Sequence, residues 1–141
     1  MIALAVLVAA LQTVTVHAPN ATLSLEVADT YESRAYGLMY RTHLAAASGM
    51  IFVFNVDGPE EFWMKNTLIP LDMIFVHADG TISSIDANVP ASKLGQESVA
   101  TRFGHGKFVI ELGAGEARKA GLKPGLRLSI PHLEPHDAGA S

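Results

Sequence analysis

The residues best suited to chemistry lie in one short stretch, where Trp63, Lys65, Asn66 and Asp72 fall within ten positions. Asp72 stands out because every other residue of the run 71–76 is apolar. An unpaired carboxylate buried in such a run would cost several kcal/mol, so Asp72 is expected to have a partner. The candidate partners are Lys65, Arg41, Arg34 and a set of backbone N–H groups.

Two roles are open for these polar residues. In the first, Asp72 forms a structural ion pair or anchors a turn behind Pro70, and the neighbouring polar side chains hold the fold together. In the second, the polar groups line a pocket with an apolar wall, to which Trp63 contributes, and orient a polar ligand. The residues expected to bind that ligand are Arg34, Arg41, Trp63, Lys65, Asn66, Asp72 and Glu111.

An enzyme is the alternative to a binding domain. It would be hydrolase-like, with Asp72 or Glu111 as general base and Lys65 or Arg34 as electrostatic stabiliser. The sequence has no cysteine and no Gly-x-Ser-x-Gly motif, and its acidic residues show no pairing that demands a glycosidase. No catalytic residue is therefore predicted.

Metal binding has weak support in the sequence. Soft thioethers such as those of Met39, Met50, Met64 and Met73 can hold Cu(I), but methionine ordinarily fills gaps in cores. The six histidines are dispersed, and the prolines at 131 and 135 prevent His132 and His136 from sharing one face of a helix. Copper binding by methionine stays an alternative, and neither a metal site nor a cofactor is predicted.

Short strands with alternating or continuous apolar character dominate the chain. A first hairpin is expected over residues 13–27, and further strands over 50–54, 61–65, 72–77, 81–86, 107–112 and 127–130. Short helices are expected from the capping pair Asp29 and Glu32 to Met39, and over residues 116–120. The fold class is therefore mostly β, a largely antiparallel β-sandwich or partly closed barrel with one or two short helices.

The 141 residues suffice for one domain, predicted over residues 12–131 and followed by a loose tail over 132–141. Residues 1–11 form an apolar leader of the length of the hydrophobic part of a signal peptide, too short to span a membrane and without the usual basic residues before it. A signal peptide would predict a periplasmic or secreted protein, and the alternative is a buried first strand. The net charge is −4 and the ten Lys and Arg residues are scattered, which disfavours nucleic-acid binding.

Several blocks together resemble a known family. The stretch 62–76 carries Trp-Met-Lys-Asn-Thr followed by Pro-Leu-Asp, and it is accompanied by blocks at residues 37–41, 49–54 and 109–112 and by Gly115. In order and spacing these blocks resemble the domain of unknown function 192 family over residues 13–130. The resemblance implies a compact, mostly antiparallel β domain, often exported in bacteria, with no established reaction or ligand. Leu126 departs from the family pattern, which has Asp at this position.

The leading hypothesis is a non-catalytic exported or periplasmic domain. It would bind a small polar ligand or an envelope partner through the face around Arg41, Trp63, Lys65, Asn66 and Asp72. The enzyme and the purely structural role are its competitors.

Overall fold

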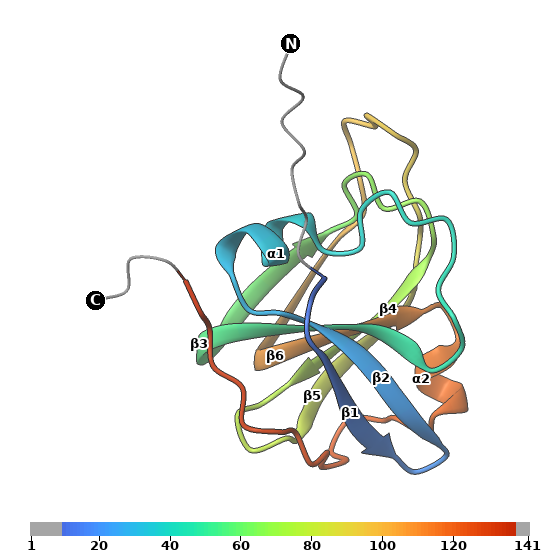
Figure 1. The fold of residues 1–141 in the computed structure, drawn as a ribbon. Helices are drawn as coiled ribbons and strands as arrows, with labels where there is room; N and C mark the ends of the chain where they lie inside the picture. The colour runs from blue at the N-terminus through green and yellow to red at the C-terminus, as the bar shows by residue number, and fades with distance from the viewer. Residues whose placement is uncertain (1–9, 138–141) are drawn as a thin grey trace.

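The computed structural model describes residues 10–137, which form six strands and two short helices (Figure 1). The prediction of a mostly β chain with one or two short helices is confirmed. The strands are β1 (Thr13–Ala18), β2 (Ala21–Ala28), β3 (Ser48–Trp63), β4 (Leu71–Val76), β5 (Ile82–Val89) and β6 (Thr101–Gly113), and the helices are α1 (Tyr31–Tyr36) and α2 (Glu116–Lys119).

The six strands make one sheet in the order β1-β2-β3-β6-β4-β5. Neighbouring strands pair antiparallel except β2 and β3, which run parallel because the segment containing α1 carries the chain back across the sheet between them. The sheet is not closed into a barrel. The expected double layering or closure is thus replaced by one sheet with a core on each face.

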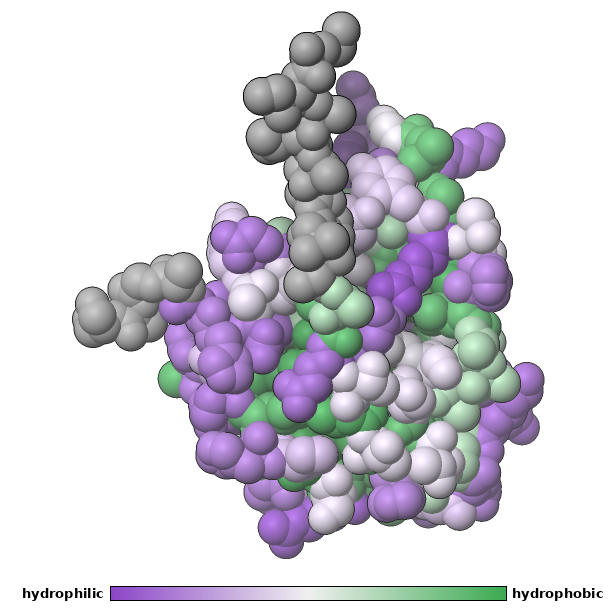
Figure 2. Space-filling view, viewed as in Figure 1, coloured by the Kyte–Doolittle hydropathy of each residue, from purple (hydrophilic) through white to green (hydrophobic). Residues whose placement is uncertain are grey.

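Both faces of the central strands are buried. In β3, Ile51 and Val53 pack on one face with aliphatic side chains such as Ile110, while Met50 and Phe52 pack on the other face. This burial on both faces explains why the central segments are continuously apolar instead of alternating. At the outer surface, hydrophobic side chains show between hydrophilic ones across the middle of the face seen in Figure 2.

Two strands are longer than the sequence predicts. Residues 50–54 and 61–65 were expected as separate strands, but β3 continues through Asp57-Gly58-Pro59 by a register shift between Val53 and Gly58. β6 begins at Thr101, six residues before the strand expected over 107–112, so the glycines on both sides of His105 lie inside a strand. The strand expected over 127–130 is reduced to a bridge between Thr81 and Arg127.

The ends of α1 also differ from the prediction. The capping box joins Thr30 and Ser33, since the Thr30 hydroxyl accepts from the Ser33 N–H and the Ser33 hydroxyl accepts from the Thr30 N–H. The helix ends at Tyr36, earlier than the expected Met39, because Gly37 has a φ of 51°. A hydroxyl pair adjacent to the expected Asp29 and Glu32 therefore sets the start of α1.

The predicted leader lies outside the described residues, apart from residues 10 and 11. Residues 132–137 have no regular structure and lie against the domain, where His136 pairs with Asp29 and Glu134 pairs with Lys107. Within residues 10–137, no helix has the length and apolar character needed to cross a membrane.

Candidate ligand-binding site

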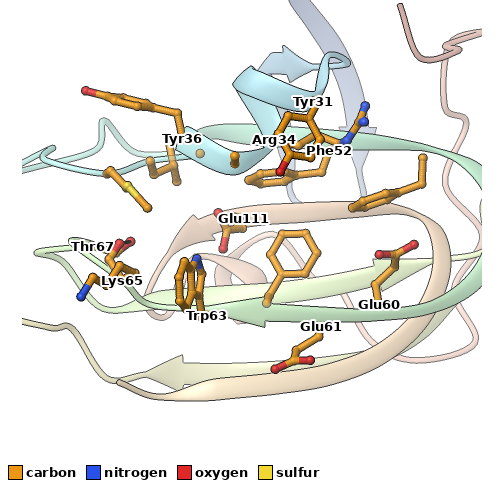
Figure 3. A pocket seen from close by; sticks show the side chains of 16 residues that line it. Tyr31, Arg34, Tyr36, Phe52, Glu60, Glu61, Trp63, Lys65, Thr67 and Glu111 are labelled. Atoms are coloured by element: carbon orange, nitrogen blue, oxygen red, sulfur yellow. Dashed lines mark hydrogen bonds between the residues drawn. The ribbon is translucent and has the colours of Figure 1, made fainter. Parts of the chain in front are cut away.

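A pocket of about 380 Å³ lies between α1 and the sheet (Figure 3). This volume is in the range of small-molecule sites. Six of the ten aromatic residues of the chain line it, together with five charged residues. The aromatic residues are Tyr31, Tyr36, Phe52, Phe54, Phe62 and Trp63, and the charged ones are Arg34, Glu60, Glu61, Lys65 and Glu111.

The helix α1 forms the roof of this pocket without filling it, because none of its residues is buried. Arg34 holds the helix over the sheet: one guanidinium nitrogen donates to the Val53 carbonyl at 3.2 Å, and the other pairs with Asp137 at 3.0 Å. The same guanidinium lies 5.6 Å from the ring centre of Phe54. After the helix, Gly37 passes the Phe52 ring so closely that a Cβ would lie 3.3 Å from it.

Glu111 lies at the floor of the pocket. It is in β6, opposite Met50 of β3 and Met73 of β4, and only 4% of it is exposed. In the described part of the chain its carboxyl group has no hydrogen bond or ion pair. Burial alone raises the pKa of Glu111 from 4.5 to about 8, so the group is mostly protonated at neutral pH.

A second carboxyl group in the pocket shows the same tendency. Burial raises the pKa of Glu60 above its ordinary value, although the positive charge of Arg34 acts in the opposite direction. In Figure 3, Glu60 lies on one side of Glu111 beneath α1, while Trp63 and Lys65 lie on the other side. The pocket therefore combines aromatic walls with two carboxyl groups that lack a full counter-charge.

Asp72 lies elsewhere, at the junction of β4 and α2. It is fully buried and accepts three backbone hydrogen bonds, from Asn88 at 2.9 Å, from Gly115 at 3.0 Å and from Ala117 at 2.9 Å. Of the partners expected from the sequence, the set of backbone N–H groups is the one found. This arrangement is that of a structural anchor.

A family model described as "Uncharacterized ACR, COG1430", the domain of unknown function 192 (DUF192), matches residues 13–130. The chain belongs to the DUF192 family. The resemblance inferred from the sequence blocks is thereby confirmed.

Two crystal structures share the fold of this DUF192 chain. One, described as a "putative transcription regulator" from Sinorhizobium meliloti 1021, is 36% identical with a TM-score of 0.69, and the match covers 83% of this chain and 91% of that one. The other, a protein of unknown function from Novosphingobium aromaticivorans DSM 12444, is 38% identical with a TM-score of 0.71 and coverages of 88% and 89%. No curated protein matches the chain.

The DUF192 fold divides the predicted site residues into separate groups. Arg34, Trp63, Lys65 and Glu111 line the pocket beneath α1, whereas Arg41, Asn66 and Asp72 do not. Arg41 pairs with Glu26 of β2. Asn66 joins two loops, since its amide donates to the Tyr40 hydroxyl at 3.1 Å and its amide oxygen accepts from the Gly95 N–H at 3.0 Å.

Other pocket residues of the DUF192 chain were missed from the sequence. Tyr31 and Tyr36 looked like ordinary helix residues, and Phe52 and Phe62 looked like core residues of separate strands. The pairing of β3 with β6 places Phe52 and Phe62 at the pocket with Glu111, and α1 contributes Tyr31 and Tyr36 from the other side. Of the four methionines considered for copper, Met50, Met64 and Met73 are fully buried in the core on this face of the sheet, whereas Met39 is partly buried and lines the pocket.

Proposed function

We propose that this DUF192 chain binds a small organic cation, an amine with an apolar or aromatic body, in the pocket beneath α1. The observation that carries the proposal is the buried carboxyl group of Glu111, which faces an aromatic pocket and has no partner in the described part of the chain. The sequence hypothesis of a small polar ligand is thereby narrowed to one charge class. Glu111 takes the central role that the sequence assigned to Asp72.

The charges of the pocket favour a cationic ligand. Both positive side chains that line it are engaged: Arg34 with Asp137 and the Val53 carbonyl, and Lys65 with the Gln96 carbonyl at 3.1 Å. Three carboxyl groups line the pocket, those of Glu60, Glu61 and Glu111, and burial raises the pKa of Glu60 and Glu111. The pocket therefore has room for a further positive charge. A ligand ammonium group would supply that charge, and Glu111 would give up its proton when the ligand binds.

The walls favour the same ligand class. Phe62 packs edge to face against Phe52 and Phe54, with ring centres 4.8 and 6.1 Å apart, so these rings form a stable surface. Trp63 is 58% exposed at the same pocket, which leaves its indole available to a ligand. Aromatic faces attract cations as well as apolar groups, and a buried carboxylate adds specificity for charge.

The proposal is tested by calorimetry with 2-phenylethylamine and with 2-phenylethanol, its neutral analogue of similar shape. The amine is expected to bind the wild-type chain at least about tenfold more tightly than the alcohol, a difference of about 1.4 kcal/mol. Repeating the titration in buffers of different ionisation heat should show release of close to one proton at pH 7, because Glu111 ionises on binding.

Two variants separate the pocket from general charge effects. Glu111→Gln should remove both the preference for the amine and the proton release. Glu97→Gln makes the same replacement of a carboxyl group by an amide on the exposed loop, away from the pocket, and should leave both unchanged. Equal binding of amine and alcohol by the wild-type chain, or amine binding that Glu111→Gln does not weaken, would contradict the proposal.

The enzyme alternative stays a prediction. If the chain has an activity, Glu111 is the better candidate for the general base, since a carboxyl group with a pKa of about 8 is suited to proton transfer near neutral pH. Asp72 is already engaged by three backbone N–H groups.

The description of the Sinorhizobium protein as a regulator does not change the proposal. This chain carries a net charge of −4 with scattered basic residues, and a nucleic-acid site would require them to be concentrated. We retain the inference that the domain acts in the periplasm or outside the cell, which rests on the apolar run of residues 1–11.

A further inference from the structure

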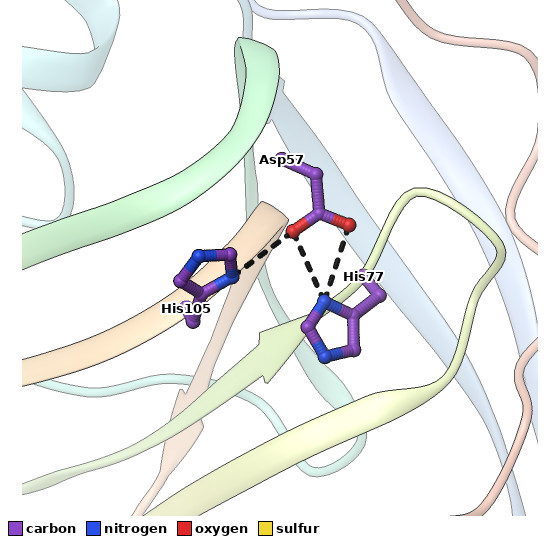
Figure 4. Close-up of side chains that lie close together, drawn as sticks. All are labelled: Asp57, His77 and His105. Atoms are coloured by element: carbon purple, nitrogen blue, oxygen red, sulfur yellow. Dashed lines mark hydrogen bonds and ion pairs between the residues drawn. The ribbon is translucent and has the colours of Figure 1, made fainter.

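Asp57, His77 and His105 form a cluster separate from the pocket beneath α1 (Figure 4). Asp57 lies in the irregular part of β3, His77 directly follows β4, and His105 lies in β6. One oxygen of Asp57, Oδ1, lies 3.0 Å from His77 Nδ1 and 3.2 Å from His105 Nδ1. The ligand atoms of all three side chains lie within 4.8 Å of one another.

We propose that these three side chains bind a divalent transition-metal ion such as Zn²⁺. Two imidazole nitrogens and one carboxylate oxygen are a ligand set that such ions prefer over Mg²⁺ or Ca²⁺, which favour oxygen. Three protein ligands leave at least one coordination position open to water or another small molecule.

The two distances from Asp57 Oδ1 suit the coordination of one ion. In tetrahedral coordination with bonds of about 2.0–2.2 Å, neighbouring ligand atoms are about 3.3–3.5 Å apart. The two distances from Asp57 Oδ1 are close to that spacing. Each histidine would release the Nδ1 proton with which it now contacts the carboxylate, and would keep a proton on Nε2.

The backbone holds the ligands in place. Asp57 Oδ2 accepts a hydrogen bond of 2.8 Å from the Ala78 N–H and also lies 3.1 Å from His77 Nδ1, so the carboxylate is held against the two rings. The contact with Ala78 corresponds to the outer hydrogen bonds that orient carboxylates in metal sites. The Ser83 hydroxyl of β5 donates to the His105 carbonyl and fixes the backbone of β6 at this residue.

Two glycines bring His105 against the end of β4. A Cβ at Gly104 would lie 2.2 Å from the Phe75 ring, and a Cβ at Gly106 would lie 2.5 Å from the Val76 carbonyl oxygen. Phe75 and Val76 directly precede His77. The absence of a side chain at Gly104 and at Gly106 therefore allows His105 to lie close to His77. Their ring centres are 5.7 Å apart.

The cluster is accessible to ions in solution. The side chains are 29% exposed for Asp57, 38% for His77 and 56% for His105. The three residues are far apart in the sequence, which explains why histidine spacing gave no sign of this site.

The test is calorimetric titration of the full chain, without an affinity tag, with Zn²⁺ and separately with Mg²⁺. One Zn²⁺ per chain should bind, and Mg²⁺ should not. His77→Gln and His105→Gln should each weaken Zn²⁺ binding by at least about tenfold, since losing even an outer partner of a metal ligand costs about 10- to 100-fold. The control His17→Gln removes an exposed histidine on β1 that belongs to no such cluster and should bind Zn²⁺ like the wild type.

NMR of the wild-type imidazoles gives a readout that does not depend on how the variants fold. Addition of one equivalent of Zn²⁺ should shift the ring resonances of His77 and His105 and leave those of His17 unchanged. The proposal would be overturned by the absence of Zn²⁺ binding, or by shifts confined to other histidines such as His132 and His136.

Discussion

Glu111 is an acidic residue at a core position of a central strand. Its neighbours across the sheet are Met50 and Met73, both fully buried, and an apolar residue at this position would extend the same core. A protonated carboxyl group there contributes less to stability than an apolar side chain of similar size, because it lacks partners in the described part of the chain. Its position facing a pocket is best explained by a ligand that completes it.

The raised pKa of Glu111 makes stability depend on pH. The folded-state pKa of about 8 lies above the ordinary 4.5, so the folded chain keeps a proton that the unfolded chain loses between these pH values. The contribution of Glu111 to the free energy of unfolding is therefore fully present below about pH 4.5 and falls as pH rises toward 8, by at most about 1.4 kcal/mol per pH unit.

Urea unfolding of the wild type and of Glu111→Gln from pH 5 to pH 8 measures this contribution. We expect the variant to gain stability relative to the wild type as pH rises, because an amide does not titrate. The contribution of Glu60 is present in both chains and cancels in the comparison. Parallel pH profiles for the two chains would show that Glu111 is not held protonated by burial.

The sequence predicted that Asp72 needs hydrogen-bond or ion-pair partners, but it did not predict which of the candidate partners are used. Asp72 was expected to be buried with partners, and it is. Its hydrogen-bond donors are the backbone N–H groups of Asn88, Gly115 and Ala117. The side-chain types at these positions do not indicate that their backbone would contact Asp72. Glu111 was recognised as a candidate, but its isolation depends on which strands flank it.

At the element scale, Asp72 connects three segments. It lies in β4 and receives N–H groups from the end of β5 and from the start of α2. The helix α2 has only four residues and no side-chain cap, so this carboxylate takes the place of an N-cap.

Asp72→Asn is therefore expected to lower the free energy of unfolding by about 3 kcal/mol or more, because buried N–H groups lose a charged acceptor. Chemical denaturation measures the change. Asp86→Asn in β5, where the described residues show no hydrogen bond to the side chain, is the matched control and should stay close to the wild type. A stable Asp72→Asn that loses amine binding would instead assign Asp72 to the ligand site.

The sequence predicted the hairpin of β1 and β2 well and the central strands β3 and β6 less well. Residues 13–27 form β1 and β2 as expected. β3 was divided in two because Asp57, Gly58 and Pro59 are residues typical of turns, and a bulge within a long strand contains the same residue types. The Asp57 cluster and the pocket beneath α1 both depend on this continuous strand.

At the scale of the whole molecule, the two faces of the sheet have different coverings. On one face α2 and residues 122–130 pack on an aliphatic core that includes Ile74 and Ile110. On the other face α1 covers a core rich in aromatic residues and methionine without filling it, and the pocket remains there. The runs of short strands predicted a mostly β domain, but the placement of α1 follows from the parallel pairing of β2 with β3.

The C-terminal segment, residues 132–137, contacts helix α1 above the pocket through Asp137. The carboxylate of Asp137 holds Arg34 of α1 through both of its oxygens, at 3.0 and 3.1 Å. This pairing gives one of the two cationic side chains that line the pocket a counter-charge. The proposed preference of the pocket for a cation would therefore depend on the C-terminal segment as well as on the pocket itself.

We propose that a cationic ligand completes the buried carboxyl group of Glu111, which has no hydrogen bond or ion pair within residues 10–137. A carbon-detected NMR titration of the glutamate carboxyl groups in the wild-type chain, with Glu111→Gln used to assign the Glu111 resonance, tests this proposal. We predict a titration midpoint near pH 8 without ligand and a lower midpoint at saturating 2-phenylethylamine. A midpoint near 4.5 that the amine does not move would contradict the account.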